Sequence, residues 1–237
     1  MIKSLMVSVF LFLVLSHQSL YSGVKVIPKA KPDLKSQDTV FDFGHVAIDF
    51  RIFHDFSLVN RSERPIKVTR VYVPCDCSSV TVLDSLINPG DTGFFRLTFS
   101  TKDYYGPTRK LFKVFTDHPD LRAVEYHYRS IIGQWLDAIK PSPTSLFFLP
   151  SHQTTKMTIP NPIYDEITVS VEHQYDTTFN ITLLKDRASR GDSLELEISP
   201  HPNLNKGTYL SNVTLRVGKE ATEEPTILTI PIKIVRY

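Results

Sequence analysis

The chain has 237 residues, of which 41% are hydrophobic and 22% are charged, with 27 Lys and Arg against 25 Asp and Glu. This composition is typical of a globular protein, because it is too apolar for a disordered chain and too polar for a protein with many membrane spans. The formal charge of +2 and the lack of a basic block in the sequence argue against a nucleic-acid-binding protein.

Residues 1–22 have the pattern of a secretory signal peptide. Lys3 precedes an apolar run from Leu5 to Leu15, and small residues follow it. A helix of this length rises about 16 Å, which is too short for a hydrocarbon core of about 30 Å. We therefore expect export to the periplasm or the cell surface, with an uncleaved N-terminal anchor as the alternative. Residues 23–37 are expected to be a disordered lead-in, and the mature chain is expected to have no transmembrane span.

From Val40 onward, apolar residues alternate with polar ones, which is the period of a β-strand. The runs are short, rich in β-branched and aromatic residues, and bounded by turn residues, as at 60–62, 88–91 and 105–107. The sequence contains no amphipathic helix of useful length. The pattern predicts an all-β protein with antiparallel sheets.

Comparison of the chain with itself at an offset of 101 residues indicates a tandem repeat. Turn residues and strand phases coincide without a gap. The matches include Asn60 with Asn161, Val68 with Val169, Gly90-Asp91 with Gly191-Asp192, and Gly106 with Gly207. Each unit has about 100 residues, the usual size of an immunoglobulin-like sandwich. We therefore predict two tandem immunoglobulin-like antiparallel β-sandwich domains, at residues 38–133 and 139–237, joined by a linker at 134–138.

An ordered set of short motifs runs through the first unit. They are Phe41-Asp42-Phe43-Gly44, Phe56-Ser57-Leu58-Val59-Asn60, Pro65-Ile66-Lys67-Val68, Cys75-Asp76-Cys77-Ser78, Ile87-Asn88-Pro89-Gly90-Asp91, Phe99-Ser100-Thr101-Lys102 and Gly106-Pro107. With these motifs, residues 38–133 resemble the DUF1573 family of exported bacterial proteins, which belongs with the immunoglobulin-like ASPM–SPD-2–Hydin group. Family members usually show Cys-Gly-Cys-Thr where this chain has Cys75-Asp76-Cys77-Ser78. The resemblance implies the fold and export, and it implies no established enzymatic activity.

Cys75 and Cys77 are the two cysteines of the chain, and three interpretations of them stay open. In a regular strand their α-carbons would lie about 6.5 Å apart, near the upper limit for a disulfide, and a turn after Pro74 would bring them closer. The first interpretation is a small-loop disulfide in an oxidising compartment. The second is a pair of packed thiols, and the third is a copper or zinc site.

Three histidines of the same unit are candidates for a third metal ligand: His45, His54 and His118. None of them has motif spacing from the cysteine pair, and a lone histidine is more often a surface residue or a satisfied core residue. The repeat counterparts of the two cysteines are Asp176 and Thr178, so the sandwich itself does not require the pair.

Tyr104 and Tyr105 lie on a predicted loop and are candidates for a partner-binding patch, because tyrosine is favoured at interfaces. The other interpretation is that they fold back onto the sandwich. No nucleophile elbow, zinc-protease motif or phosphate loop occurs in the sequence. We therefore predict a non-enzymatic exported cell-envelope protein, without a cofactor, that acts as a protein-interaction or assembly module and binds another envelope protein. The alternative is a metal-binding (copper or zinc) or thiol-redox protein that uses Cys75 and Cys77.

Overall fold

The computed structural model describes residues 39–136, 139–151, 153–219 and 224–237. These residues belong to one compact unit, Asp33–Tyr237. The expected signal peptide, the expected lead-in and part of the expected linker lie outside the described residues. Among the residues described, no helix is long and apolar enough to cross a membrane.

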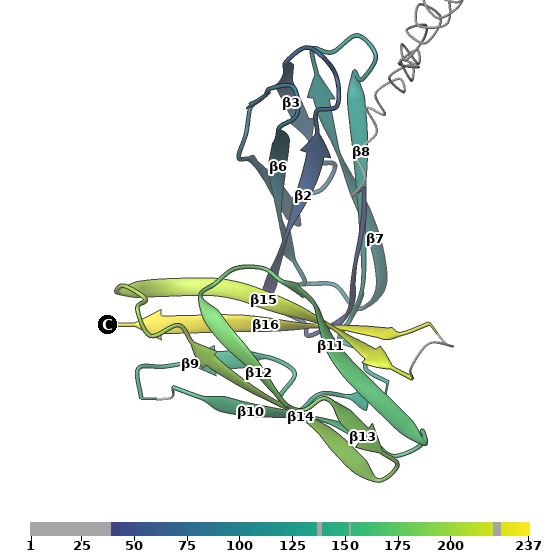
Figure 1. The fold of residues 1–237 in the computed structure, drawn as a ribbon, viewed down its shortest axis with the longest axis vertical. Helices are drawn as coiled ribbons and strands as arrows, with labels where there is room; N and C mark the ends of the chain where they lie inside the picture. Colours follow the sequence, from purple (N-terminus) through teal and green to yellow (C-terminus); the bar gives the residue numbers. More distant parts are fainter. Residues whose placement is uncertain (1–38, 137–138, 152, 220–223) are drawn as a thin grey trace, which may run out of the picture. The chain divides into compact units, whose positions relative to one another are not determined.

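The described residues fold mainly into β-strands, as the alternating pattern predicts (Figure 1). The first half of the chain forms β1 (Val40–Val46), β2 (Arg51–Val59), β3 (Ile66–Tyr72), β4 (Ser78–Val82), β5 (Leu86–Ile87), β6 (Thr92–Ser100), β7 (Gly106–Thr116) and β8 (Ala123–Ile132). The second half forms β9 (Leu146–Phe148), β10 (Thr155–Asn161), β11 (Glu166–Gln174), β12 (Phe179–Lys185), β13 (Arg187–Ser189), β14 (Asp192–Pro200), β15 (Gly207–Gly218) and β16 (Thr226–Arg236). The protein is therefore all-β.

The strands form one large sheet and two small ones. The large sheet has the order β13-β11-β15-β16-β1-β8-β7-β3-β5, and β9 also pairs with β16. The small sheets have the orders β2-β6-β4 and β10-β14-β12. Strands from the two halves of the chain thus share the large sheet, while each half has a small sheet of its own.

Two separate hydrophobic cores lie between these sheets. The first comprises residues between 43 and 132 and is rich in aromatic rings, as shown by Phe112 and Tyr126, which stack with centroids 4.9 Å apart. The second comprises residues between 139 and 234 and is mainly aliphatic. In β8 every second side chain is buried in the first core. In this strand the alternation in the sequence shows directly which side chains are buried.

The expectation of purely antiparallel sheets is wrong for three strand pairs. β1 pairs in parallel with both β8 and β16, and β9 pairs in parallel with β16. Long stretches of chain separate the members of each pair, so no hairpin imposes an antiparallel direction on them.

Gly44 lets β1 lie between β8 and β16. Its φ is +60°, and a Cβ at this position would lie 2.0 Å from the carbonyl oxygen of Ile227 in β16. Beside it, the hydroxyl of Thr229 donates a hydrogen bond of 2.6 Å to the carbonyl of Phe43. Only glycine combines this backbone conformation with so close an approach. The last residue of the Phe41–Gly44 motif is therefore explained by the junction with β16.

A buried asparagine holds an equivalent turn in each half of the chain. The side-chain amide of Asn60 donates a 2.8 Å hydrogen bond to the carbonyl of Ile87. The amide of Asn161 donates a 2.9 Å bond to the carbonyl of Ala188. The main-chain carbonyl of Asn60 accepts a 2.8 Å hydrogen bond from the N–H of Gly90, and that of Asn161 accepts a 2.7 Å bond from the N–H of Gly191. The hydrogen bonds of these turns thus recur at the offset of 101 found in the sequence.

Candidate functional site

Cys75 and Cys77 form a disulfide in the turn between β3 and β4. Their α-carbons lie 5.3 Å apart, closer than in a regular strand, because the chain turns after Pro74. Both cysteines are partly exposed, and Asp76 between them is exposed. The carbonyl of Cys77 accepts a 2.8 Å bond from the N–H of Ser100 in β6. Of the three interpretations of the pair, the structure adopts the disulfide.

The disulfide adjoins a hydroxyl pair at the edge of the first core. Ser78 Oγ lies 2.6 Å from the hydroxyl of Tyr128, and 3.8 Å and 3.6 Å from the sulfurs of Cys75 and Cys77. Burial raises the pKa of Tyr128, and the hydrogen bond to Ser78 opposes this shift. A neutral tyrosine and a serine therefore flank the disulfide, and neither is a base that activates a thiol at neutral pH.

The three candidate histidines lie on different elements and are buried. In β1, Nδ1–H of His45 donates a 2.7 Å hydrogen bond to the carbonyl of Gln134. In β2, the ring of His54 stacks on Phe41, with centroids 3.6 Å apart. His118 lies in the turn between β7 and β8, where its Nδ1 accepts a bond from the N–H of Asp120.

Within the described ranges, no group of three or more His, Cys, Asp and Glu side chains is placed to hold a metal ion. The structure does not bring the three histidines together with Cys75 and Cys77. A copper or zinc site at the pair would also require the disulfide to be reduced, because metals bind the thiolate form of cysteine.

The two candidate tyrosines behave differently. Tyr104 packs against the first core, 6.0 Å from the ring of Phe99, and the ammonium group of Lys110 lies 4.7 Å from its centroid. Tyr105 is 73% exposed. The structure therefore assigns the folded-back position to Tyr104 and the solvent-facing position to Tyr105.

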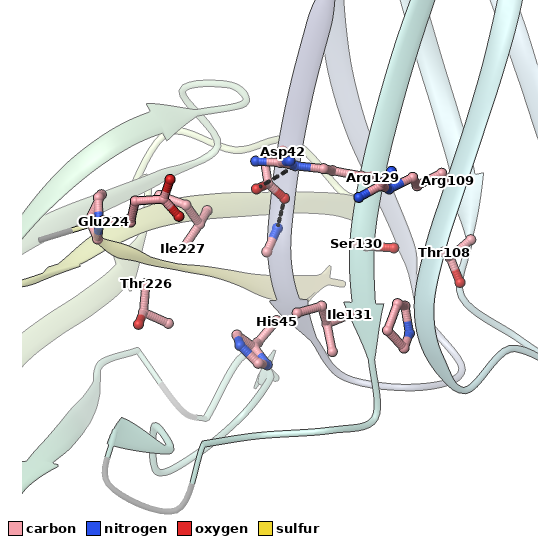
Figure 2. Close-up of a pocket in the computed structure, with 13 residues that line it drawn as sticks. Asp42, His45, Thr108, Arg109, Arg129, Ser130, Ile131, Glu224, Thr226 and Ile227 are labelled. Atoms are coloured by element: carbon pink, nitrogen blue, oxygen red, sulfur yellow. Dashed lines mark hydrogen bonds and ion pairs between the residues drawn. The ribbon is translucent and has the colours of Figure 1, made fainter.

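A pocket of about 360 Å³ lies where β1, β7 and β8 approach the start of β16 (Figure 2). Figure 2 shows Asp42, Arg129 and Arg109 in a row across β1, β8 and β7. Nε of Arg129 donates a 2.8 Å hydrogen bond to the carboxylate of Asp42, which also accepts one from the N–H of Gly44. Arg109 lies directly opposite Arg129, an unfavourable pairing of like charges. Glu224 lines the other side of the pocket.

Among the described residues that line this pocket, no hydroxyl is hydrogen-bonded to a histidine. The hydroxyl of Ser130 is buried without a hydrogen-bond partner among the described residues. His45, which also lines the pocket, is bonded to the carbonyl of Gln134 instead. A hydrogen-bonded base is what activates a serine, and His45 is not placed to act as one for Ser130.

Sequence reasoning did not identify Arg109 or Arg129. The two arginines are twenty positions apart and become neighbours only through the register of β7 and β8. Their linear spacing carries no motif. Asp42 belongs to the Phe41–Gly44 motif, but its two hydrogen bonds depend on the bend of β1 at Gly44.

Comparison with known proteins tests the family resemblance. Residues 34–125 match the family model DUF1573, described as a protein of unknown function. The resemblance inferred from the motifs of the first unit is confirmed. The match covers less than half of the chain and ends within β8. A search of curated proteins finds no match.

Solved structures similar to this chain share little sequence with it. The VesB protease of Vibrio cholerae is 11% identical, with a TM-score of 0.36, over 43% of this chain and 32% of that chain. A protein of unknown function from Porphyromonas gingivalis is 13% identical, with a TM-score of 0.34, over 85% of this chain and 99% of that one. The ASH/PapD-like domain of human CEP192 is 10% identical, with a TM-score of 0.35, over 51% of this chain and 99% of that domain. These likenesses assign neither an activity nor a partner to this chain.

Proposed function

We propose that this protein is an exported, non-enzymatic interaction or assembly module of the cell envelope. In this proposal it consists of two tandem immunoglobulin-like β-sandwich domains, residues 38–133 and 139–237, and it uses no cofactor. The signal-peptide pattern of residues 1–22 supports export, and so does the resemblance to the DUF1573 family. The two separate cores and the recurring turn hydrogen bonds support the tandem arrangement.

One observation carries the binding role. At one end of the first unit, Tyr105 is 73% exposed and Ile48 is 53% exposed. Both rest on the backbone of Gly133, because a Cβ there would lie 2.7 Å from Ile48 Cγ2 and 3.0 Å from Tyr105 Cδ2. An aromatic and an aliphatic side chain thus form a shared solvent-facing surface, which we call the Tyr105–Ile48 surface. Tyrosine is enriched among the residues that dominate binding energy at interfaces.

This surface is held by neighbouring packing. Tyr104 anchors one loop to the first core, and the buried Thr101 anchors the other. The hydroxyl of Thr101 donates a 2.9 Å bond to the carbonyl of Ala47, next to Ile48. A surface ordered before binding loses less conformational entropy when a partner docks. The arrangement therefore suits a recognition surface.

Quantitative affinity capture from the producing cells tests this proposal. The variant Tyr105→Ser with Ile48→Ser removes the surface. The matched control is Tyr72→Ser with Leu86→Ser, which removes a tyrosine 48% exposed and a leucine 56% exposed elsewhere on the same unit. We expect the first variant to lose its captured partner proteins by at least about tenfold and the control to retain them. Equal capture by both variants would contradict the proposal.

The second candidate is a thiol-redox function of the Cys75–Cys77 disulfide. The observation that favours it is the partial exposure of both cysteines, since reactive sulfurs must be accessible. Such a protein would accept two electrons and two protons from a dithiol partner and become a dithiol itself.

Intact-mass measurement with alkylation, on protein taken directly from cells, would show a mixed reduced and oxidised population. A fully oxidised population, with partner capture unchanged in Cys75→Ser with Cys77→Ser, would exclude it. A native mass heavier by one copper or zinc would instead support the metal alternative.

A further inference from the structure

A second cavity, of about 390 Å³, is lined by Asp49, the residue that follows Ile48, and by three cationic side chains. They come from three separate segments: Arg51 at the start of β2, Lys102 just after β6, and Lys233 in β16. Asp49 is the single carboxylate among the residues that line this cavity. The cavity therefore has a formal excess of positive charge.

The charges of these cations are not neutralised within the described part of the chain. Arg51 and Lys102 make no side-chain hydrogen bond or ion pair there, although other described residues form ion pairs. The ammonium group of Lys233 lies over the ring of Phe147, 5.3 Å from its centroid, which leaves its charge intact. Three cations without a carboxylate partner around one cavity favour an anionic ligand.

The buried Thr101 fixes the two loops that carry these cations. Its backbone N–H donates a 2.8 Å bond to the carbonyl of Phe50, and its hydroxyl accepts a 2.9 Å bond from the N–H of Phe50. Phe50 is next to Arg51, and Thr101 is next to Lys102. Within the Phe99–Lys102 motif, Thr101 thus links the two loops by hydrogen bonds and places Lys102 and Arg51 at one cavity. Preorganised charges recognise a ligand at lower entropic cost.

We propose that this cavity binds an acidic peptide segment of the protein that docks on the Tyr105–Ile48 surface. This inference rests on the proposed function and adds the chemistry of the partner. The cavity walls include Phe50, Pro231 and Leu210, which is 38% exposed. Apolar walls beside cations suit a peptide that carries both carboxylates and apolar side chains. A concave site of this size fits a peptide better than a flat layer of lipid headgroups.

Selection from a displayed library of random peptides tests the inference on the full mature chain. Three baits are compared: the wild type, the cavity variant Arg51→Glu, Lys102→Glu, Lys233→Glu, and the control variant Lys67→Glu, Arg122→Glu, Lys206→Glu. The control residues are exposed and, like the three cavity cations, have no ion pair among the described residues. Both variants carry the same change of charge, and thermal unfolding checks that each is folded.

We expect the wild type and the control to select peptides rich in Asp and Glu. Binding of these synthetic peptides should weaken at least about tenfold in the cavity variant and by less than about twofold in the control. It should also weaken with added salt, because exposed charges are screened.

Other outcomes overturn the inference. Selected peptides without an acidic excess, or equal loss in both variants, would show that the cavity does not recognise carboxylates. If only phosphatidylglycerol vesicles bound and only the cavity variant lost them, the ligand would be a membrane surface instead. Peptides that depend on Tyr105 and Ile48 but not on the three cations would refute this inference and leave the proposed function intact. Selection of no peptide by the wild type would refute the inference, and the capture experiment above would then judge the proposed function separately.

Discussion

The turn at Cys75–Cys77 and the equivalent turn at Asp176–Thr178 are built alike but closed differently. In each, the carbonyl of the last residue accepts a 2.8 Å bond from a backbone N–H at the end of a strand, Ser100 in one case and His201 in the other. In the first turn a disulfide links the outer residues. In the second, the carboxylate of Asp176 accepts bonds of 2.9 Å and 2.6 Å from the backbone and the hydroxyl of Thr178.

The surroundings of the two turns differ as well. Pro74, which precedes the first turn, is exposed. Its counterpart Tyr175 is stacked on Phe53 of the first unit, with centroids 4.9 Å apart, and lies 5.1 Å from the guanidinium of Arg96. The second turn therefore packs against the first half of the chain, while the first turn faces solvent. The comparison shows that side-chain hydrogen bonds close the second turn where a disulfide closes the first.

The largest expected effect comes from breaking the feature that both units share. Asn60→Ala and Asn161→Ala each remove two side-chain hydrogen bonds to main-chain carbonyls. Leaving these carbonyls without a donor should lower the free energy of unfolding by about 2–4 kcal/mol in each variant. Urea unfolding measures the loss, and the exposed Asn203→Ala is the control, with a change below about 0.5 kcal/mol. Very different losses in the two asparagine variants would show that the turns are not equivalent.

An intermediate effect is expected from exchanging the two ways of closing the turn. Cys75→Ser with Cys77→Ser should cost about 1–2 kcal/mol, because a loop of three residues gains little from a covalent link. Cys75→Asp with Cys77→Thr copies the second turn into the first and should recover about 0.5–1 kcal/mol of that loss.

Urea unfolding of the three proteins under oxidising conditions measures this exchange. If the Asp and Thr pair is no more stable than the two serines, the two turns differ in more than their closing link. A loss well above about 2 kcal/mol would mean that the disulfide is essential to the first unit after all.

Sequence reasoning predicted the features that depend on local pattern. The all-β class followed from strand alternation, and the offset of 101 anticipated the matching bonds of Asn60 and Asn161. It could not predict the parallel pairing of β1, because alternation carries no information on strand direction. It also missed the charged cavities, since Arg51, Lys102 and Lys233 are distant in sequence and converge only in the folded chain.

The smallest expected effect concerns the contact made by the second turn. Burial raises the pKa of Tyr175 to about 12, from an ordinary value of 10.0, and Arg96 opposes the shift. The folded state holds the phenol proton of Tyr175 more tightly than the unfolded state does. The stability that this tyrosine contributes is therefore fully present below pH 10.0 and is lost as the pH rises toward about 12. Tyr175→Phe should remove this part of the fall in stability with rising pH, which urea midpoints between pH 9 and about 12 measure. An identical decline in wild type and variant would contradict the burial of this tyrosine against the first unit.

Site-specific photo-crosslinking in intact cells tests most directly whether the Tyr105–Ile48 surface binds a partner protein. A benzophenone amino acid replaces Tyr105 in one protein and Tyr72, also exposed, in the other. Binding through the Tyr105–Ile48 surface predicts a discrete adduct from position 105 that disappears when Ile48→Asp is added, and none from position 72. Adducts of equal yield from both positions, or none from position 105, would contradict it.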